Sequence, residues 1–392
     1  MYSKNTRSKL ARIYADRRRL PRWARGLHAL QTGLPSLDAE LKETTPLRIF
    51  AIDILWLSGF MLMSGAGAML MGLTSLLTMA GIVMTAIGIL GSIGRLRRLV
   101  VGHVHEATHG IVTKFYKARG KSKKSARHNT EIILDVGTAL SFSMNGQDYR
   151  REHARHHTME KLGTLRDPDG LVLQEWGLWP GEVKNLKLAL LARALNPVWH
   201  LRFFQARVKS NLFRGRPYRR LMGLGVLALL IGSAFVLPTA VWFAMVFIPF
   251  GPGYQIASML QVITEHPYGF ADPATTLDEL AARTWERIPY DPMPCMFSRT
   301  PLRDWLYWGA RLPGHIASRL TVLDDTMIAH GYHHLAWPVG RPFEDWWNTA
   351  ARFVEAFEAG ALPEGADERI VWGLGEAITR QAAHFKALAR DQ

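Results

Sequence analysis

The chain has 392 residues, of which 48% are hydrophobic, and its only cysteine is Cys295. This length and apolar content exclude a disulfide-stapled miniprotein and a disordered tail, and a single cysteine cannot form an internal disulfide or a thiolate metal cluster. Lysine and arginine (48) outnumber aspartate and glutamate (33), and the net charge of +15 predicts an anionic partner: nucleic acid, an anionic membrane surface, an acidic electron carrier or a phosphorylated carrier.

The N-terminal segment is strongly basic, with nine lysines and arginines in the first 25 residues. We expect residues 1–45 to form an amphipathic segment that lies on anionic lipid head groups. The predicted organisation continues with a membrane domain over residues 46–350 and a helical cytoplasmic tail over residues 351–392.

Two long stretches of the chain carry no Asp, Glu, Lys or Arg. They run from Ile54 to Gly94 and from Met222 to Thr264. A membrane-spanning helix needs about 20 apolar residues, so each stretch is long enough for two spans joined by a tight turn. We predict an all-α integral membrane protein with four transmembrane helices in two hairpins, with turns at Met71-Gly72-Leu73 and Leu237-Pro238-Thr239.

The uncharged turns leave every lysine and arginine on the side of the membrane that holds both termini. The positive-inside rule makes that side the cytoplasm, and we expect a bacterial inner membrane. Residues 95–221 and the tail then form one helical cytoplasmic cap. Within it, Lys114–Lys124 is predicted to be a solvated basic loop. Leu186–Val208 is predicted to form helices that lie along the membrane interface and are interrupted at Pro197.

Three histidine clusters follow the apolar stretches. The first is HEATH (His105 to His109), the second is HARHH (His153 to His157), and the third is HGYHH (His330 to His334). Spacings of three and four residues place imidazoles on one face of a helix, where they can bind one metal ion.

The clusters supply eight imidazoles, whereas one first-row metal ion takes about six ligands at most, so the sequence predicts two metal ions. His266, at the end of the second uncharged stretch, is the expected ninth ligand. Imidazole suits Fe, Cu, Zn or Ni, so ligand type alone leaves the metal open. We expect His103 to point away from this set, and His28, His128, His200, His315 and His384 to be ordinary histidines. The predicted metal ligands are His105, His109, His153, His156, His157, His266, His330, His333 and His334.

The order of these boxes, with one apolar pair before the first and another between the second and third, resembles the membrane-bound fatty acid desaturase and hydroxylase superfamily. Arg166–Asp169 (RDPD) is similar to the DPD that follows the second box in bacterial acyl desaturases. Leu335–Pro338 is similar to their HHLxP ending, with the proline one residue later. The interval between His109 and His153 is longer than in a simple acyl desaturase. The resemblance covers about residues 45 to 345.

The resemblance implies a di-iron centre that activates O2 and removes hydrogen from an unactivated C–H bond. We expect desaturation of a fatty acyl chain presented as lipid, thioester or free acid; hydroxylation, or oxidative decarboxylation to a terminal alkene, is the alternative. No flavin or nicotinamide fingerprint is present, so a separate electron donor such as ferredoxin or rubredoxin is expected. The carboxylates expected to orient the imidazoles are Glu106, Glu152, Glu265, Asp167, Asp169, Asp324 and Asp325.

Two other classes of protein account for less of the sequence. A membrane anchor with a nucleic-acid-binding tail would use the positive charge, but it leaves the histidine spacing unexplained, and we predict no nucleic-acid partner. A transporter would place ionisable residues inside its spans, whereas both apolar stretches are uncharged.

Overall fold

A computed structural model describes most of the chain. The described residues are 26–27, 44–288, 302–322, 330–331, 334 and 369–390. Almost all of the predicted N-terminal segment 1–45 and, among the predicted site residues, His333 lie outside this set, as do His28, Asp324 and Asp325.

Four helices are long and apolar enough to cross a membrane. The first is α3 (Pro46–Leu70) and the third is α12 (Pro217–Val236). The second, Ser75–Thr108, is one continuous helix made of α4 (Ser75–Arg98), the π-helix η1 (Leu99–Val104) and α5 (His105–Thr108). The fourth, Thr239–Glu265, joins α13 (Thr239–Trp242), the π-helices η2 (Phe243–Phe247) and η3 (Pro249–Gly253), and α14 (Tyr254–Glu265).

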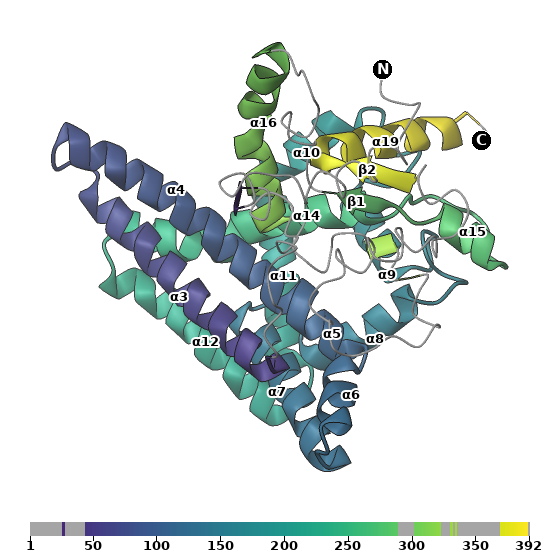
Figure 1. Ribbon diagram of the computed structural model, residues 1–392, viewed down its shortest axis with the longest axis horizontal. Helices are drawn as coiled ribbons and strands as arrows, with labels where there is room; N and C mark the ends of the chain where they lie inside the picture. Colours follow the sequence, from purple (N-terminus) through teal and green to yellow (C-terminus); the bar gives the residue numbers. More distant parts are fainter. Residues whose placement is uncertain are drawn as a thin grey trace.

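Helices α3 and α4 lie side by side along their length (Figure 1). The short connection between them begins at Met71, and Gly72 within it has a φ of +92°, which favours glycine. Glycines allow the close approach: a Cβ added to Gly88 would lie 2.4 Å from the backbone nitrogen of Ser64. Large apolar side chains on the outside of the pair, such as Leu76 (80% exposed), have no protein neighbour to cover them and suit a lipid environment.

The fourth apolar helix is irregular where it contacts the first pair: η2 lies against α3 and η3 against α4. Gly251 has non-helical angles (φ −101°, ψ −113°) next to Pro252, which lacks the backbone N–H that a helix needs. A kink here is expected from proline, and it redirects the chain into α14. The α12 helix packs alongside, and Nε1 of Trp242 donates a hydrogen bond to the carbonyl of Leu230 (3.2 Å).

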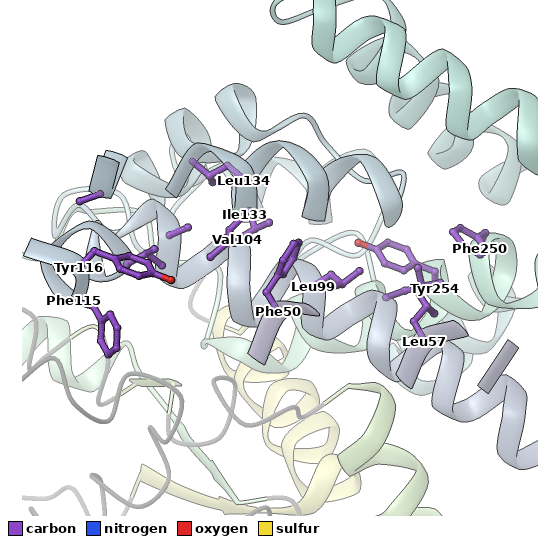
Figure 2. Close-up of a cluster of buried hydrophobic side chains, with 14 of the residues drawn as sticks. Phe50, Leu57, Leu99, Val104, Phe115, Tyr116, Ile133, Leu134, Phe250 and Tyr254 are labelled. Carbon is purple, nitrogen blue, oxygen red and sulfur yellow. The ribbon is translucent and has the colours of Figure 1, made fainter. Parts of the chain in front are cut away.

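A buried apolar core joins the membrane-type helices to the first histidine segment. Phe50 and Leu57 of α3 pack with Leu99 and Val104 of η1 (Figure 2). Further members come from α6 (Ile111–Ala118), α7 (Lys123–Leu140) and α14, so the residues just before His105 are fixed from several sides. Rigid packing of this kind holds the box in one position.

The remaining helices are α8 (Gly146–His156), α9 (Pro168–Glu175), α10 (Leu186–Ala194), α11 (Pro197–Phe213), α15 (Leu277–Ala282), α16 (Leu302–Thr321) and α19 (Gly373–Leu388). Of these, α8, α9, α15 and α19 lie at the right of Figure 1, α16 is at its top, and α10 and α11 lie nearer the centre. A second core, with Trp199, Met259, Ile263 and Phe385 among its buried members, connects α11 and α14 to α19.

The described chain is all-helical, as predicted, apart from one short strand pair. In it, β1 (Glu286–Ile288) pairs in parallel with β2 (Ile370–Trp372), and both strands are too short to give a periodic signal in the sequence. One expectation needs correction. Lys114–Lys124 is not a loop: it includes the end of α6, a turn with Gly120 at φ +76°, and the start of α7. The exposed lysines there keep the surface solvated while the backbone is helical.

Candidate metal centre

The first two histidine boxes lie at helix ends. His105 starts α5, and His109 caps it before Gly110, whose φ of +72° ends the helix. The second box lies on α8, which begins at Asn145; that side chain accepts hydrogen bonds from the backbone N–H groups of residues 147 and 148. This cap stabilises the start of a short polar helix that would otherwise be only marginally stable.

The other two segments come from the distant part of the chain. His266 directly follows α14 and is fully buried. His330 and His334 are buried one helical turn apart, with their Nε2 atoms 3.1 Å from each other. His333, the remaining predicted ligand, lies outside the described residues.

The structure brings these eight histidines together in two groups of four. The first consists of His105, His109, His153 and His157, and the second of His156, His266, His330 and His334. Within each group one ligand atom per residue lies within 4.8 Å of all the others. The rings of His157 and His334 stack at 4.0 Å, so the two groups adjoin.

The chemistry of the groups fits metal ions. Burial lowers the pKa of His109, His153, His157 and His334 well below 6.5, which leaves these imidazoles neutral, the form that binds metals. In the first group, Nε2 of His109 and Nε2 of His153 converge to 2.8 Å. Histidine groups of this kind could hold a metal ion, and their composition does not choose which one.

His156 is anchored by a buried carboxylate. Its Nδ1 donates to Oδ1 of Asp167 (2.9 Å), and its Nε2 is buried with no hydrogen-bond partner among the described residues. Asp167 is fully buried and accepts hydrogen bonds from the backbone N–H groups of Gly163 and Asp169. Burial opposes protonation of His156, but Asp167 and Asp169 raise its pKa to about 10. The carboxylate on Nδ1 orients the ring and would also stabilise a cation bound at Nε2.

Two other predicted carboxylates also contact histidines of the cluster. Nδ1 of His105 donates to Glu106 (3.0 Å), and Nε2 of His330 lies 2.7 Å from Glu265. Glu152 behaves differently, because it pairs with Arg151 and Arg155 on the surface of α8.

Most of the histidines predicted to be outside the cluster lie elsewhere. His103 contacts Asp53 (2.6 Å), and His200 contacts Gln255 and the carbonyl of Ala194. His128 is exposed, His315 is buried in α16, and His384 lies against Phe270.

Sequence reasoning missed two residues at the centre. Tyr149 stacks on His153 (5.4 Å between ring centres), and its position one helical turn before that histidine is the signal that could have identified it. Asp53 holds Arg95, Arg98 and His103 beside the first box. It lies directly before the first uncharged stretch, where an isolated acid is unusual.

A cavity of about 950 Å³ reaches the histidines. His105 and His153 of the first group and His156 of the second line it. Its other walls come from α4, η1, α9, α11 and α14, and include the apolar side chains Val100, Val101, Val172, Trp176 and Phe203. Charged and polar side chains, such as Arg97, Glu175 and Gln261, line it as well. A cavity that combines apolar walls with polar groups is typical of a small-molecule site.

Fold and site together define a mainly helical protein with four helices suited to a membrane and a buried histidine cluster able to hold metal ions. Comparison of the chain with protein-family models, curated proteins and solved structures found no match.

Proposed function

We propose that this protein is a membrane-bound di-iron enzyme that desaturates a fatty acyl chain with O2. The observation that carries the proposal is the convergence of eight histidines, from four separate segments, into two adjoining groups, each of which contributes to the lining of one cavity. The resemblance of the three boxes to the desaturase and hydroxylase superfamily supports iron, O2 and an acyl substrate.

The overall reaction is R–CH2–CH2–R′ + O2 + 2e⁻ + 2H⁺ → R–CH=CH–R′ + 2H2O. Two iron ions, when bound, would supply the reduction of O2 and the abstraction of hydrogen. The two histidine groups would hold one ion each. The electrons must come from another protein, and a ferredoxin or rubredoxin of acidic surface suits the net charge of +15.

The protein's own residues orient the metal-binding histidines and hold the substrate. Asp167 and Glu106 each accept the Nδ1 proton of a histidine, which leaves Nε2 of His156 and His105 to face the metal. The cavity walls would hold the alkyl chain by shape and exclude water, because an alkyl chain offers no hydrogen bonds to recognise.

The proposed setting is a bacterial inner membrane with two helical hairpins and both termini in the cytoplasm. The short, uncharged connections after Leu70 and Val236 support this arrangement, since they lie at the ends of the spans remote from His105 and His266. An acyl chain could then enter the cavity from the bilayer.

The test is mass spectrometry of lipids and hydrocarbons from a host that expresses the protein and receives labelled saturated fatty acids. We expect an internal olefin with the wild type, none with His156→Ala, and wild-type yield with the exposed control His128→Ala. A hydroxylated product, or a one-carbon-shorter alkene without the internal olefin, would contradict desaturation and retain the di-iron proposal.

Metal content provides an independent check. The purified protein should carry about two iron ions per chain. Full activity with stoichiometric zinc or copper would show that the metal assignment is wrong.

A further inference from the structure

One arginine in the cavity wall is buried without a counter-ion. Arg97 on α4 is only 5% exposed. Its Nη1 donates to Oγ of Ser258 (2.7 Å), and its guanidinium lies 5.2 Å from the ring centre of Tyr254. Its Nε is buried with no hydrogen-bond partner, and no carboxylate pairs with it anywhere in the described chain.

Neighbouring arginines are satisfied within the protein. Arg95 and Arg98, on the same helix, both pair with Asp53. Arg207, buried on the other side of Tyr254, donates to three backbone carbonyls, those of residues 141, 142 and 250. Arg97 therefore differs from the others in having unused donor capacity, and it lines the cavity.

Five acidic residues line the cavity, and among the described residues none of them forms an ion pair with Arg97. Asp148 pairs with Arg151, Glu152 with Arg155 and Glu265 with His330, and Asp169 lies 3.6 Å from His156. The fifth is Glu175. A buried charge without a partner is unfavourable, and the missing partner of a guanidinium is an anion that accepts two parallel hydrogen bonds. Carboxylate and phosphate groups have this geometry.

We propose that Arg97 binds the anionic head group of the substrate inside the cavity. The substrate class is then an amphiphile with a small ionised head, either a free carboxylate or a phosphate monoester, rather than an acyl chain esterified to a bulky carrier. That the bound tail is an acyl chain to be oxidised rests on the proposed function.

Exposed basic side chains in the cavity lining also favour an anionic substrate. Arg202 and Lys209 of α11 and the following Arg214 line the cavity and are exposed. An anionic amphiphile would be attracted to these positive charges before its head reaches Arg97.

A fixed head group also determines where the chain is attacked. Arg97 lies eight residues before His105 on one continuous helix, which is ~12 Å along the helix axis. The reactive carbon should therefore be counted from the head and not from the methyl end. Saturated acids of 14, 16 and 18 carbons should give double bonds at the same distance from the carboxyl group.

The binding test uses iron-free full-length protein in nanodiscs, so that it does not depend on turnover. The probes are radiolabelled palmitate, hexadecyl phosphate and uncharged methyl palmitate. We expect wild type to bind at least one anion at least tenfold more tightly than methyl palmitate, and Arg97→Gln to lose this preference. Arg95→Gln, which removes the same charge from the same helix, should retain it.

The two anionic probes identify the head group: preference for palmitate indicates a carboxylate, and preference for hexadecyl phosphate indicates a phosphate. If Arg97→Gln does not fold, Arg97→Lys keeps the charge but lacks the planar fork, and should weaken anion binding severalfold. The proposal is overturned if wild type binds neither anion, if it binds all three probes equally, or if both Arg97 variants bind as wild type does. A preference that depends on Arg97 in a protein that oxidises no acyl chain would support the head-group site and reject the proposed function.

Discussion

At the scale of single residues, local spacing identified the candidate metal-binding histidines, but it could not predict which carboxylates contact them. His153 and His157 join the same group because a separation of four residues puts side chains on one side of a helical turn, and the adjacent His156 belongs to the second group. The contact between Glu265 and His330 joins segments far apart in sequence, and nothing local distinguishes Glu265 from Glu152, which pairs with arginines instead. Such contacts depend on tertiary packing.

Replacement of Asp167 with asparagine tests the support of the second group. Asparagine can still cap α9, so the fold should persist, but His156 loses its carboxylate. Loss of such a partner typically weakens metal binding by about 10- to 100-fold. After dialysis against a chelator, we expect about one iron per chain to be lost, measured by mass spectrometry of the metal. Glu152→Gln is the matched control and should keep both ions; equal retention in the two variants would contradict the assigned role.

At the scale of elements, apolar length predicted the four long helices and missed their irregularities. A pattern search for a 3.6-residue period cannot detect η1, where the backbone widens directly before His105. Likewise, β1 and β2 are only three residues long and are strands because they pair with each other. Neither has an alternating sequence pattern long enough to predict it. The elements that the sequence patterns missed are thus those that depend on contacts with distant parts of the chain.

The glycines between α3 and α4 give a prediction about helix packing. In Gly88→Ala, the new methyl group meets the backbone of α3, and overpacking should cost about 1–3 kcal/mol of stability. Gly59→Ala makes the same change where nothing lies within 4 Å. Thermal unfolding in detergent should show a lower midpoint for Gly88→Ala only. Equal midpoints would mean that the two helices separate easily.

At the scale of the whole molecule, the topology can be measured with single cysteines. In a Cys295→Ser background, Leu73→Cys reports the connection after α3, and Lys121→Cys reports the turn between α6 and α7. We expect an impermeant thiol reagent to label Leu73→Cys in intact cells and Lys121→Cys only after permeabilisation, because positive residues stay in the cytoplasm. The reverse pattern would invert the proposed orientation.

The net charge predicts how the electron donor binds. An acidic carrier is attracted to a chain of charge +15 by long-range forces, which salt screens. When reconstituted donor is limiting, turnover should fall as ionic strength rises, while turnover with an excess of a small uncharged reductant should not. Salt-independent turnover with the protein donor would argue against electrostatic docking.

The division of the histidines between two groups has a consequence for biosynthesis. All four members of the first group occur by residue 157, before the second pair of apolar helices has been synthesised. The second group needs His330 and His334, so it is complete only after all four spans have left the ribosome. If each group holds one ion, as proposed, the ligands of the first ion are all synthesised early, whereas those of the second ion are complete only in the finished, fully inserted protein.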